Sequence, residues 1–125
     1  MVIKNFSDRD RIVNSLDKHL KKLYDGILIN GIKVSFVCIE KSRGMGSFET
    51  FYIHFDLGDY EGVVIRFSGH NDKTGTSDLH LWNDDFTSVS ELLSAINNSL
   101  VDYIKINKDY LLEQCQDEPD IIDEY

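Results

Sequence analysis

The segment Phe51–Phe67, which reads FYIHFDLGDYEGVVIRF, carries the strongest structural signal in the chain. Large apolar residues occupy every second position in its first half and again in its second half. This is the period-two pattern of strands that bury one face. The expected inward set is Phe51, Ile53, Phe55 and Leu57 on one strand, and Val63, Ile65 and Phe67 on the other. The segment therefore predicts a β-hairpin.

The length of the turn decides which side chains of this hairpin face each other. A two-residue turn would pair Ile53 with Val64, which belong to opposite faces. A three-residue turn over Gly58–Tyr60 pairs Ile53 with Ile65, so both strands bury the same face. The predicted register therefore pairs Phe51 with Phe67, Phe55 with Val63 and, on the outer face, Tyr52 with Arg66.

Helical patterns lie at both ends of the chain. Ser7 is the expected N-cap of the first helix, and Gly26 is its expected end. Between them, apolar residues recur at helical spacing (Ile12, Leu16, Leu20 and Leu23). The second helix starts at a capping box of Ser88 and Glu91, and its apolar stripe extends to about Leu112.

Two further strands are expected. In Ile32–Lys41, alternation directs Val34, Phe36 and Cys38 toward the core. Ser77–Trp82 is expected to form a fourth strand, with Leu79 and Leu81 facing opposite to His80 and Trp82. The segment Ile27–Ile32 contains Asn30-Gly31, which fits either a tight hairpin or a last helical turn; we favour the hairpin. Glycines predict flexible loops over 42–47 and 69–76.

These elements predict an α+β fold. The expected architecture is a two-layer sandwich, in which a four-stranded antiparallel meander is flanked by an N-terminal and a C-terminal helix (α-β-β-β-β-α). Residues 1–112 are expected to form a single domain. Residues 113–125 contain six acidic residues and no basic one, and they predict a flexible acidic tail.

Composition narrows the range of functions. The net charge of −9 argues against a protein that binds nucleic-acid phosphates, so we expect no nucleic-acid partner. The two cysteines do not form a disulfide framework, which favours a reducing, cytoplasmic location. No stretch is long and apolar enough to span a membrane, and we expect no membrane association.

The outer face of the predicted sheet is the candidate binding surface. Alternation places eight residues on it: Val37, Ile39, Tyr52, His54, Val64, Arg66, His80 and Trp82. Exposed sheet faces are usually polar, whereas aromatic residues and arginine are enriched in the centres of protein interfaces. The face therefore predicts a partner surface or a homodimer contact. A third structural layer covering it, or a small-ligand site, are the alternatives.

The sequence gives little support for a catalytic or metal-binding site. His54, His70, His80, Asp56 and Asp78 are possible metal ligands, but none has the spacing of a known zinc motif, so we expect no metal and no cofactor. A catalytic pair of Cys38 and His54 would require Cys38 to lie outside the core, whereas alternation directs it inward. Ser68 and His70 are close in sequence only. The loop containing Gly44 and Gly46 lacks the Lys-Ser/Thr of a phosphate-binding loop.

The segment Ser47–His70 resembles a hairpin in small proteins of phages and mobile elements, whose second strand ends roughly I-R-I-S-D-H. The corresponding residues here are Ile65, Arg66, Phe67, Ser68, Gly69 and His70. Gly69 stands where an acid is usual, so no role that needs this carboxylate is carried over. The resemblance covers about a fifth of the chain and implies an accessory protein of a mobile element.

Together these observations favour a non-enzymatic phage or mobile-element protein that binds and inhibits a host or defence protein, as anti-CRISPR proteins do. Its partner could itself be a basic, nucleic-acid-binding protein. One alternative is an immunity protein that neutralises a basic toxin. Another is a small ligand-binding or hydrolytic domain that uses Arg66, His70 and His54.

Overall fold

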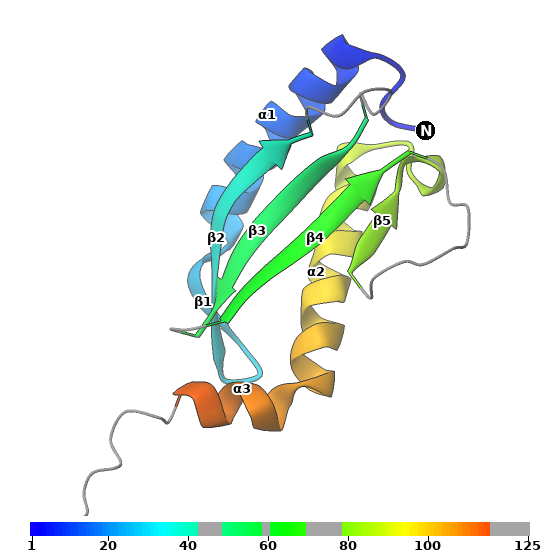
Figure 1. Cartoon of the computed structure of the whole chain (residues 1–125). Helices are drawn as coiled ribbons and strands as arrows, with labels where there is room; N and C mark the ends of the chain where they lie inside the picture. Colours follow the sequence, from blue (N-terminus) through cyan, green and yellow to red (C-terminus); the bar gives the residue numbers. More distant parts are fainter. Residues whose placement is uncertain (43–48, 59–60, 70–78, 116–125) are drawn as a thin grey trace, which may run out of the picture.

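The computed structural model describes residues 1–42, 49–58, 61–69 and 79–115 (Figure 1). Within these residues, five strands form one mixed sheet in the order β1-β2-β3-β4-β5, with helices before and after it. The α+β class is confirmed, but the expected four-stranded antiparallel meander is wrong in strand number and in the direction of the last strand. Apart from Ser42 and Gly69, the expected loops 42–47 and 69–76 lie outside the described residues, as does most of the acidic tail.

The strands are β1 (Asp25–Ile29), β2 (Ile32–Lys41), β3 (Phe51–Leu57), β4 (Glu61–Ser68) and β5 (His80–Trp82). The helices are α1 (Phe6–Leu23), α2 (Val89–Ile106) and α3 (Lys108–Cys115), with a 3-10 turn at Asn83–Asp85. The β3–β4 register is confirmed, with Ile53 opposite Ile65 and Tyr52 opposite Arg66. Burial of one common face fixed this register, as the alternation predicted.

The Asn30-Gly31 turn joins β1 and β2 as a tight hairpin, which confirms the favoured reading of this segment. Both turn residues have positive φ angles, 51° at Asn30 and 85° at Gly31. A type I′ turn needs this geometry, and Asn-Gly is its preferred sequence. Gly26 does not end α1. It lies inside β1 at a register shift between Asp25 and Ile27, with a φ of 75° that suits a bulge glycine.

A bulge at Val37 divides β2 and reverses its faces. Phe36 lies opposite Phe55, but the next pair is Cys38 with His54, and then Ile39 with Ile53. The extra residue therefore turns Cys38 outward, where it is exposed, and turns Ile39 toward the core. Two expectations are wrong for this reason: Cys38 is not a core residue, and Ile39 is not on the outer face.

Strand β5 is shorter than expected and runs parallel to β4. It covers only His80–Trp82 and pairs Arg66 with His80 and Phe67 with Leu81. Parallel neighbours require a crossover rather than a tight turn, and residues 69–79 provide the necessary length. The inward position of Leu81 and the outward positions of His80 and Trp82 are as predicted, because alternation does not depend on strand direction.

The N-cap of helix α1 lies two residues before the expected one. Asn5 is the N-cap, and its side-chain oxygen accepts the backbone N–H of Asp8 at 2.8 Å. Ser7 therefore lies inside the first turn. The helix ends at Leu23, and Tyr24 leads directly into β1. The buried side chains of the helix are Ile12, Val13, Leu16 and Leu20, which include three of the four predicted stripe residues.

Helix α2 begins at the predicted cap, where Ser88 Oγ accepts the N–H of Glu91 at 3.2 Å. The helical pattern is then interrupted at Asn107, before its expected end near Leu112. The side-chain amide of Asn107 donates to the carbonyl of Tyr103 at 2.9 Å and so competes with the helical ladder. Helix α3 then takes a new direction (Figure 1) and contributes the buried Leu111.

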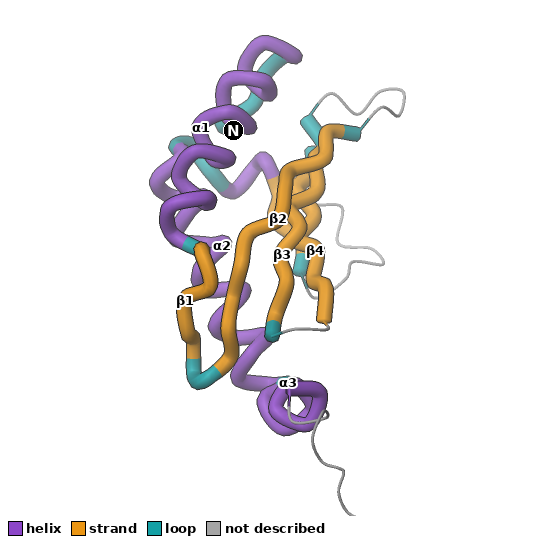
Figure 2. Tube along the Cα trace, turned by 90° about the vertical axis from the view of Figure 1, so that its left-hand side faces the viewer, coloured by secondary structure: helices purple, strands orange, loops and turns teal. Residues whose placement is uncertain are grey.

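The helices cover one face of the sheet. Figure 2 shows α1 and α2 on the same side of the strands. The largest fully buried side chains include Phe51, Phe55 and Phe67 from the sheet, and the rings of Phe51 and Phe67 stack with centroids 4.7 Å apart. This two-layer core leaves the opposite face without a described helix.

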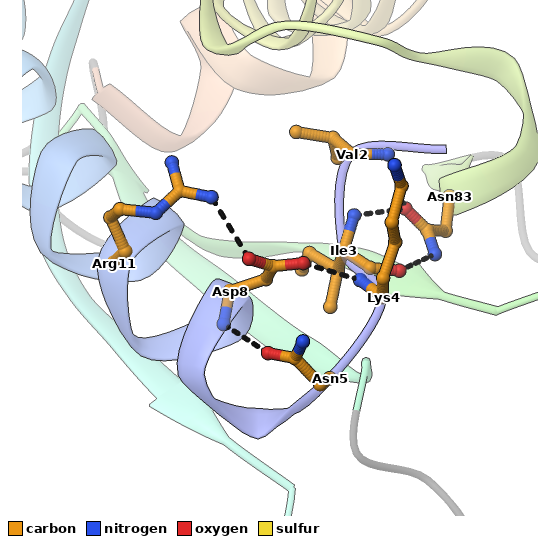
Figure 3. A network of polar contacts seen from close by, with 7 residues as sticks. All are labelled: Val2, Ile3, Lys4, Asn5, Asp8, Arg11 and Asn83. Atoms are coloured by element: carbon orange, nitrogen blue, oxygen red, sulfur yellow. Dashed lines mark hydrogen bonds and ion pairs between the residues drawn. The ribbon is translucent and has the colours of Figure 1, made fainter.

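The N-terminal segment is fixed by a buried asparagine in the turn after β5 (Figure 3). Asn83 Oδ1 accepts the N–H groups of Val2 and Ile3 at 3.0 and 2.9 Å, and its Nδ2 donates to the Ile3 carbonyl at 2.7 Å. Only 1% of Asn83 is exposed. Its amide therefore satisfies backbone groups that burial would otherwise leave unpaired.

Candidate surface on the outer face

The outer face of the sheet, as the structure defines it, is built from β2, β3, β4 and β5. It consists of Val37, Cys38, Glu40, Tyr52, His54, Val64, Arg66, His80 and Trp82. Seven of the eight residues expected on this face are present. The bulge replaces the eighth, Ile39, with Cys38 and Glu40, neither of which was expected there.

Apolar side chains are exposed near the middle of this face. Val37 is 49% and Val64 is 41% exposed, and His54 lies between them on β3. Tyr52 and Arg66 form the neighbouring cross-strand pair. Among the described residues, no helix or strand is stacked over this group. The arrangement combines an apolar centre with an aromatic ring and a guanidinium, which suits contact with another protein.

His54 contacts the carboxylate of Glu40 on the neighbouring strand. Its Nε2 lies 3.1 Å from Glu40 Oε1, and the contact is an ion pair only when the imidazole is protonated. Cys38 is the direct cross-strand partner of His54. A thiol, an imidazole and a carboxylate therefore share one region of the face. A hollow lined by Glu40 and Tyr52 includes neither Cys38 nor His54 in its lining.

Ser68 forms a short hydrogen bond with His80. Its Oγ lies 2.6 Å from His80 Nε2, and the His80 ring stacks on Trp82 with centroids 3.7 Å apart. Ser68 itself is only 6% exposed. The bond links β4 to the three-residue strand β5, so it stabilises a strand that has few ladder hydrogen bonds of its own.

Metal binding finds no support in the described part of the chain, where no three His, Cys, Asp or Glu side chains gather as ligands. His54 and His80 lie on strands separated by β4, as expected. His70 and Asp78 lie outside the described residues. The alternative ligand-binding or hydrolytic site of Arg66, His70 and His54 therefore lies partly outside the described residues.

Sequence reasoning missed Cys38 and Glu40 on this face for one reason. The run Val34–Ile39 is apolar at most positions, so it fits either face, and no glycine marks the bulge at Val37. Asn83 was missed because an asparagine after a strand is ordinarily read as a turn residue. Its hydrogen bonds reach the other end of the chain, and no local pattern indicates them.

No helix in the described ranges is both long enough and apolar enough to cross a membrane. Comparison of the chain with models of protein families gave no match. Searches of curated proteins and of solved structures gave no match either.

Proposed function

We propose that this chain is a binding protein whose outer face contacts another protein. The observation that carries the proposal is the placement of both long helices on one side of the sheet (Figure 2). The other side exposes Val37 and Val64 beside Tyr52 and Arg66. Exposed valines next to a tyrosine and an arginine form a typical anchor group of interfaces.

The proposed partner is a host or defence protein that this chain inhibits. The resemblance of Ser47–His70 to mobile-element hairpins supports this choice, as do the small size and the net charge of −9. An acidic protein approaches basic partners faster, because long-range attraction raises the association rate. An immunity protein would bind a basic toxin through the same long-range electrostatic attraction.

The experiment compares three forms of the chain as affinity baits in extracts of its native host. The first is the wild type. The second carries Val64→Thr with Arg66→Ala, two exposed positions of β4 that a strand tolerates. The third carries Lys22→Ala, an exposed change on α1 far from the outer face. Candidate partners are proteins that the wild type and the Lys22 variant both retain, and the β4 variant is then compared with them. Circular dichroism verifies that all three are folded.

The affinity of the purified partner for each form of the chain then tests the proposal. We expect the β4 double variant to bind at least about tenfold more weakly than the wild type, which corresponds to about 1.4 kcal/mol. The proposal is wrong if the partner binds the β4 variant and the wild type equally well. Trp82→Ala is a poorer probe, because Trp82 stacks on His80 and its loss would disturb β5.

A further inference from the structure

The second half of β2 is a free edge of the sheet. Strand β1 pairs with β2 only over Ile32–Ser35, and the N–H of Phe36 still bonds to the carbonyl of Tyr24 at 2.9 Å. Beyond the bulge at Val37, no described strand lies on this side of β2. Free edges present unpaired backbone groups to solvent, and they are natural sites for another strand to add.

The backbone groups at this edge can be assigned from one hydrogen bond. The N–H of Ser42 donates to the carbonyl of Thr50 at 3.0 Å, on the β3 side. Hydrogen-bonding direction alternates along an antiparallel strand. The N–H and C=O groups of Ile39 and Lys41 therefore point away from β3, toward the free edge. In the described part of the chain, no backbone partner is present for them there.

A hollow of about 760 Å³ lies beside this edge. It is lined by four consecutive residues at the end of β2, by one residue of α1 and by one of β3: Ile39, Glu40, Lys41, Ser42, Arg9 and Tyr52. The edge thus faces an open space bounded by side chains, rather than packed protein.

Arg9 gives the hollow a preference for acidic groups. Its side chain is only 12% exposed, and its Cζ lies 5.1 Å from the centre of the Phe6 ring. Within the described residues its side chain makes one hydrogen bond, from Nη1 to the Ser42 carbonyl at 3.2 Å. The buried Nε has no hydrogen-bond partner, and the nearest carboxylate oxygen, Oδ1 of Asp10, is 3.8 Å away. A guanidinium has five N–H donors, so most of the hydrogen-bonding capacity of Arg9 is unused.

Two cations and two carboxylates lie around the hollow. Lys41 Nζ donates to Asp10 Oδ1 at 3.1 Å, and the Glu40 carboxylate contacts His54. Arg9 differs from Lys41 in that the nearest Asp10 oxygen is 3.8 Å from its Nε, beyond hydrogen-bonding distance. A carboxylate entering the hollow would meet a guanidinium that can bind it through two parallel hydrogen bonds.

We propose that the free edge of β2 binds, by strand addition, an extended segment of a partner protein that carries an acidic side chain. The segment's backbone pairs with the outward groups of Ile39 and Lys41, and its carboxylate binds Arg9. Main-chain pairing supplies affinity in such complexes, and side-chain pockets supply specificity. This edge adjoins the outer face, because Glu40 and Tyr52 also line the hollow, but the inference does not depend on the function proposed above.

The test is an NMR titration of the ¹⁵N-labelled full chain with the peptide acetyl-Thr-Val-Glu-Val-Thr-Val-amide. We expect saturable shifts and slowed hydrogen exchange at the amides of Ile39 and Lys41. The amide of Ser42, which already bonds within the sheet, serves as the internal control. No change at Ile39 and Lys41 up to millimolar peptide, or changes confined to other regions, would overturn the proposal.

Two altered peptides separate the backbone and charge contributions without changing the protein. A peptide N-methylated at every residue has no backbone N–H to donate along either edge, and we expect it to lose binding. A peptide with lysine in place of glutamate should bind at least tenfold more weakly. Equal binding by either altered peptide contradicts the corresponding half of the proposal. Arg9→Gln, checked for folding by its spectrum, should remove the preference for glutamate over lysine.

Discussion

Two acidic residues at helix N-termini occupy equivalent environments. Asp8 Oδ2 accepts the N–H of Lys4 at 3.0 Å, and Glu91 Oε1 accepts the N–H of Thr87 at 2.7 Å and its hydroxyl at 3.0 Å. The backbone bond from Lys4, and then the bond from Arg11, hold the pKa of Asp8 below its usual value. The backbone bond from Thr87 is the main cause of a lowered pKa at Glu91. Each bond favours the ionised form.

These lowered pKa values predict how the free energy of unfolding depends on pH. A carboxyl group with a lower pKa in the folded state stabilises the fold above its unfolded pKa, about 4 for these residues. That contribution is lost as the pH falls through the folded-state pKa. Urea denaturation between pH 6 and pH 3 should therefore show a smaller acid-induced loss of stability in Glu91→Gln than in the wild type. Asp102→Asn, at an exposed carboxylate of α2 that makes no hydrogen bond with another described residue, is the control and should behave like the wild type.

Asn83 is the polar side chain whose loss we expect to cost most. Asn83→Ala removes the partner of the buried N–H and carbonyl of Ile3 and of the part-buried N–H of Val2. An unsatisfied buried group costs about 1–3 kcal/mol, so the variant should lose at least that much stability in urea denaturation. Asn98→Ala, at an exposed position of α2, should have little effect. A loss of the same size in both variants would contradict the role assigned to Asn83.

At the scale of elements, the strand features that the sequence predicted correctly are those that follow from a strict alternation of apolar and polar residues. The β3–β4 register followed from apolar residues such as Ile53 and Ile65, because each has only one face on which it can be buried. The bulge at Val37 was not predictable, since residues on both sides of it are apolar. The direction of β5 was not predictable either, because three residues define a face but not a direction. Of the candidate face, only Ile39 was misplaced, and the bulge accounts for it.

Phe51 and Tyr52 are adjacent residues of β3 on opposite faces of the sheet. Comparing their alanine variants tests whether the outer face is open to solvent. Phe51 is fully buried, and Phe51→Ala should cost about 3–5 kcal/mol in the free energy of unfolding. Tyr52 is only half-buried and lies on the outer face, so Tyr52→Ala should cost much less. Chemical denaturation of both variants measures the difference. Equal losses would indicate that a further layer covers the outer face, which was the alternative left open by the sequence.

At the scale of the molecule, charge is distributed unevenly along the chain. Residues 116–125 contain Asp117, Glu118, Asp120, Asp123 and Glu124 and no basic residue. The expected domain boundary at Leu112 lies within α3, and Leu111 just before it is buried. A truncation that tests the acidic segment should therefore be made after Cys115, so that the helix remains.

We expect truncation after Cys115 to weaken binding of the partner modestly and mainly through the association rate. The segment supplies long-range attraction to a basic partner, and salt screens such attraction over about 8 Å at physiological ionic strength. Stopped-flow or surface plasmon resonance should show a slower association at low salt that approaches the wild-type rate at high salt. A loss of binding that persists at high salt would assign the main contacts to the acidic segment instead of the outer face.

The hydrogen bonds between Asn83 and the first residues of the chain impose an order of events during protein synthesis. Val2 and Ile3 leave the ribosome early, but their partner is 80 residues further along. Until that partner emerges, the apolar side of α1 has neither α2 beside it nor an anchored N-terminal segment. The nascent chain therefore cannot complete this part of its core until the residues after β5 have been synthesised.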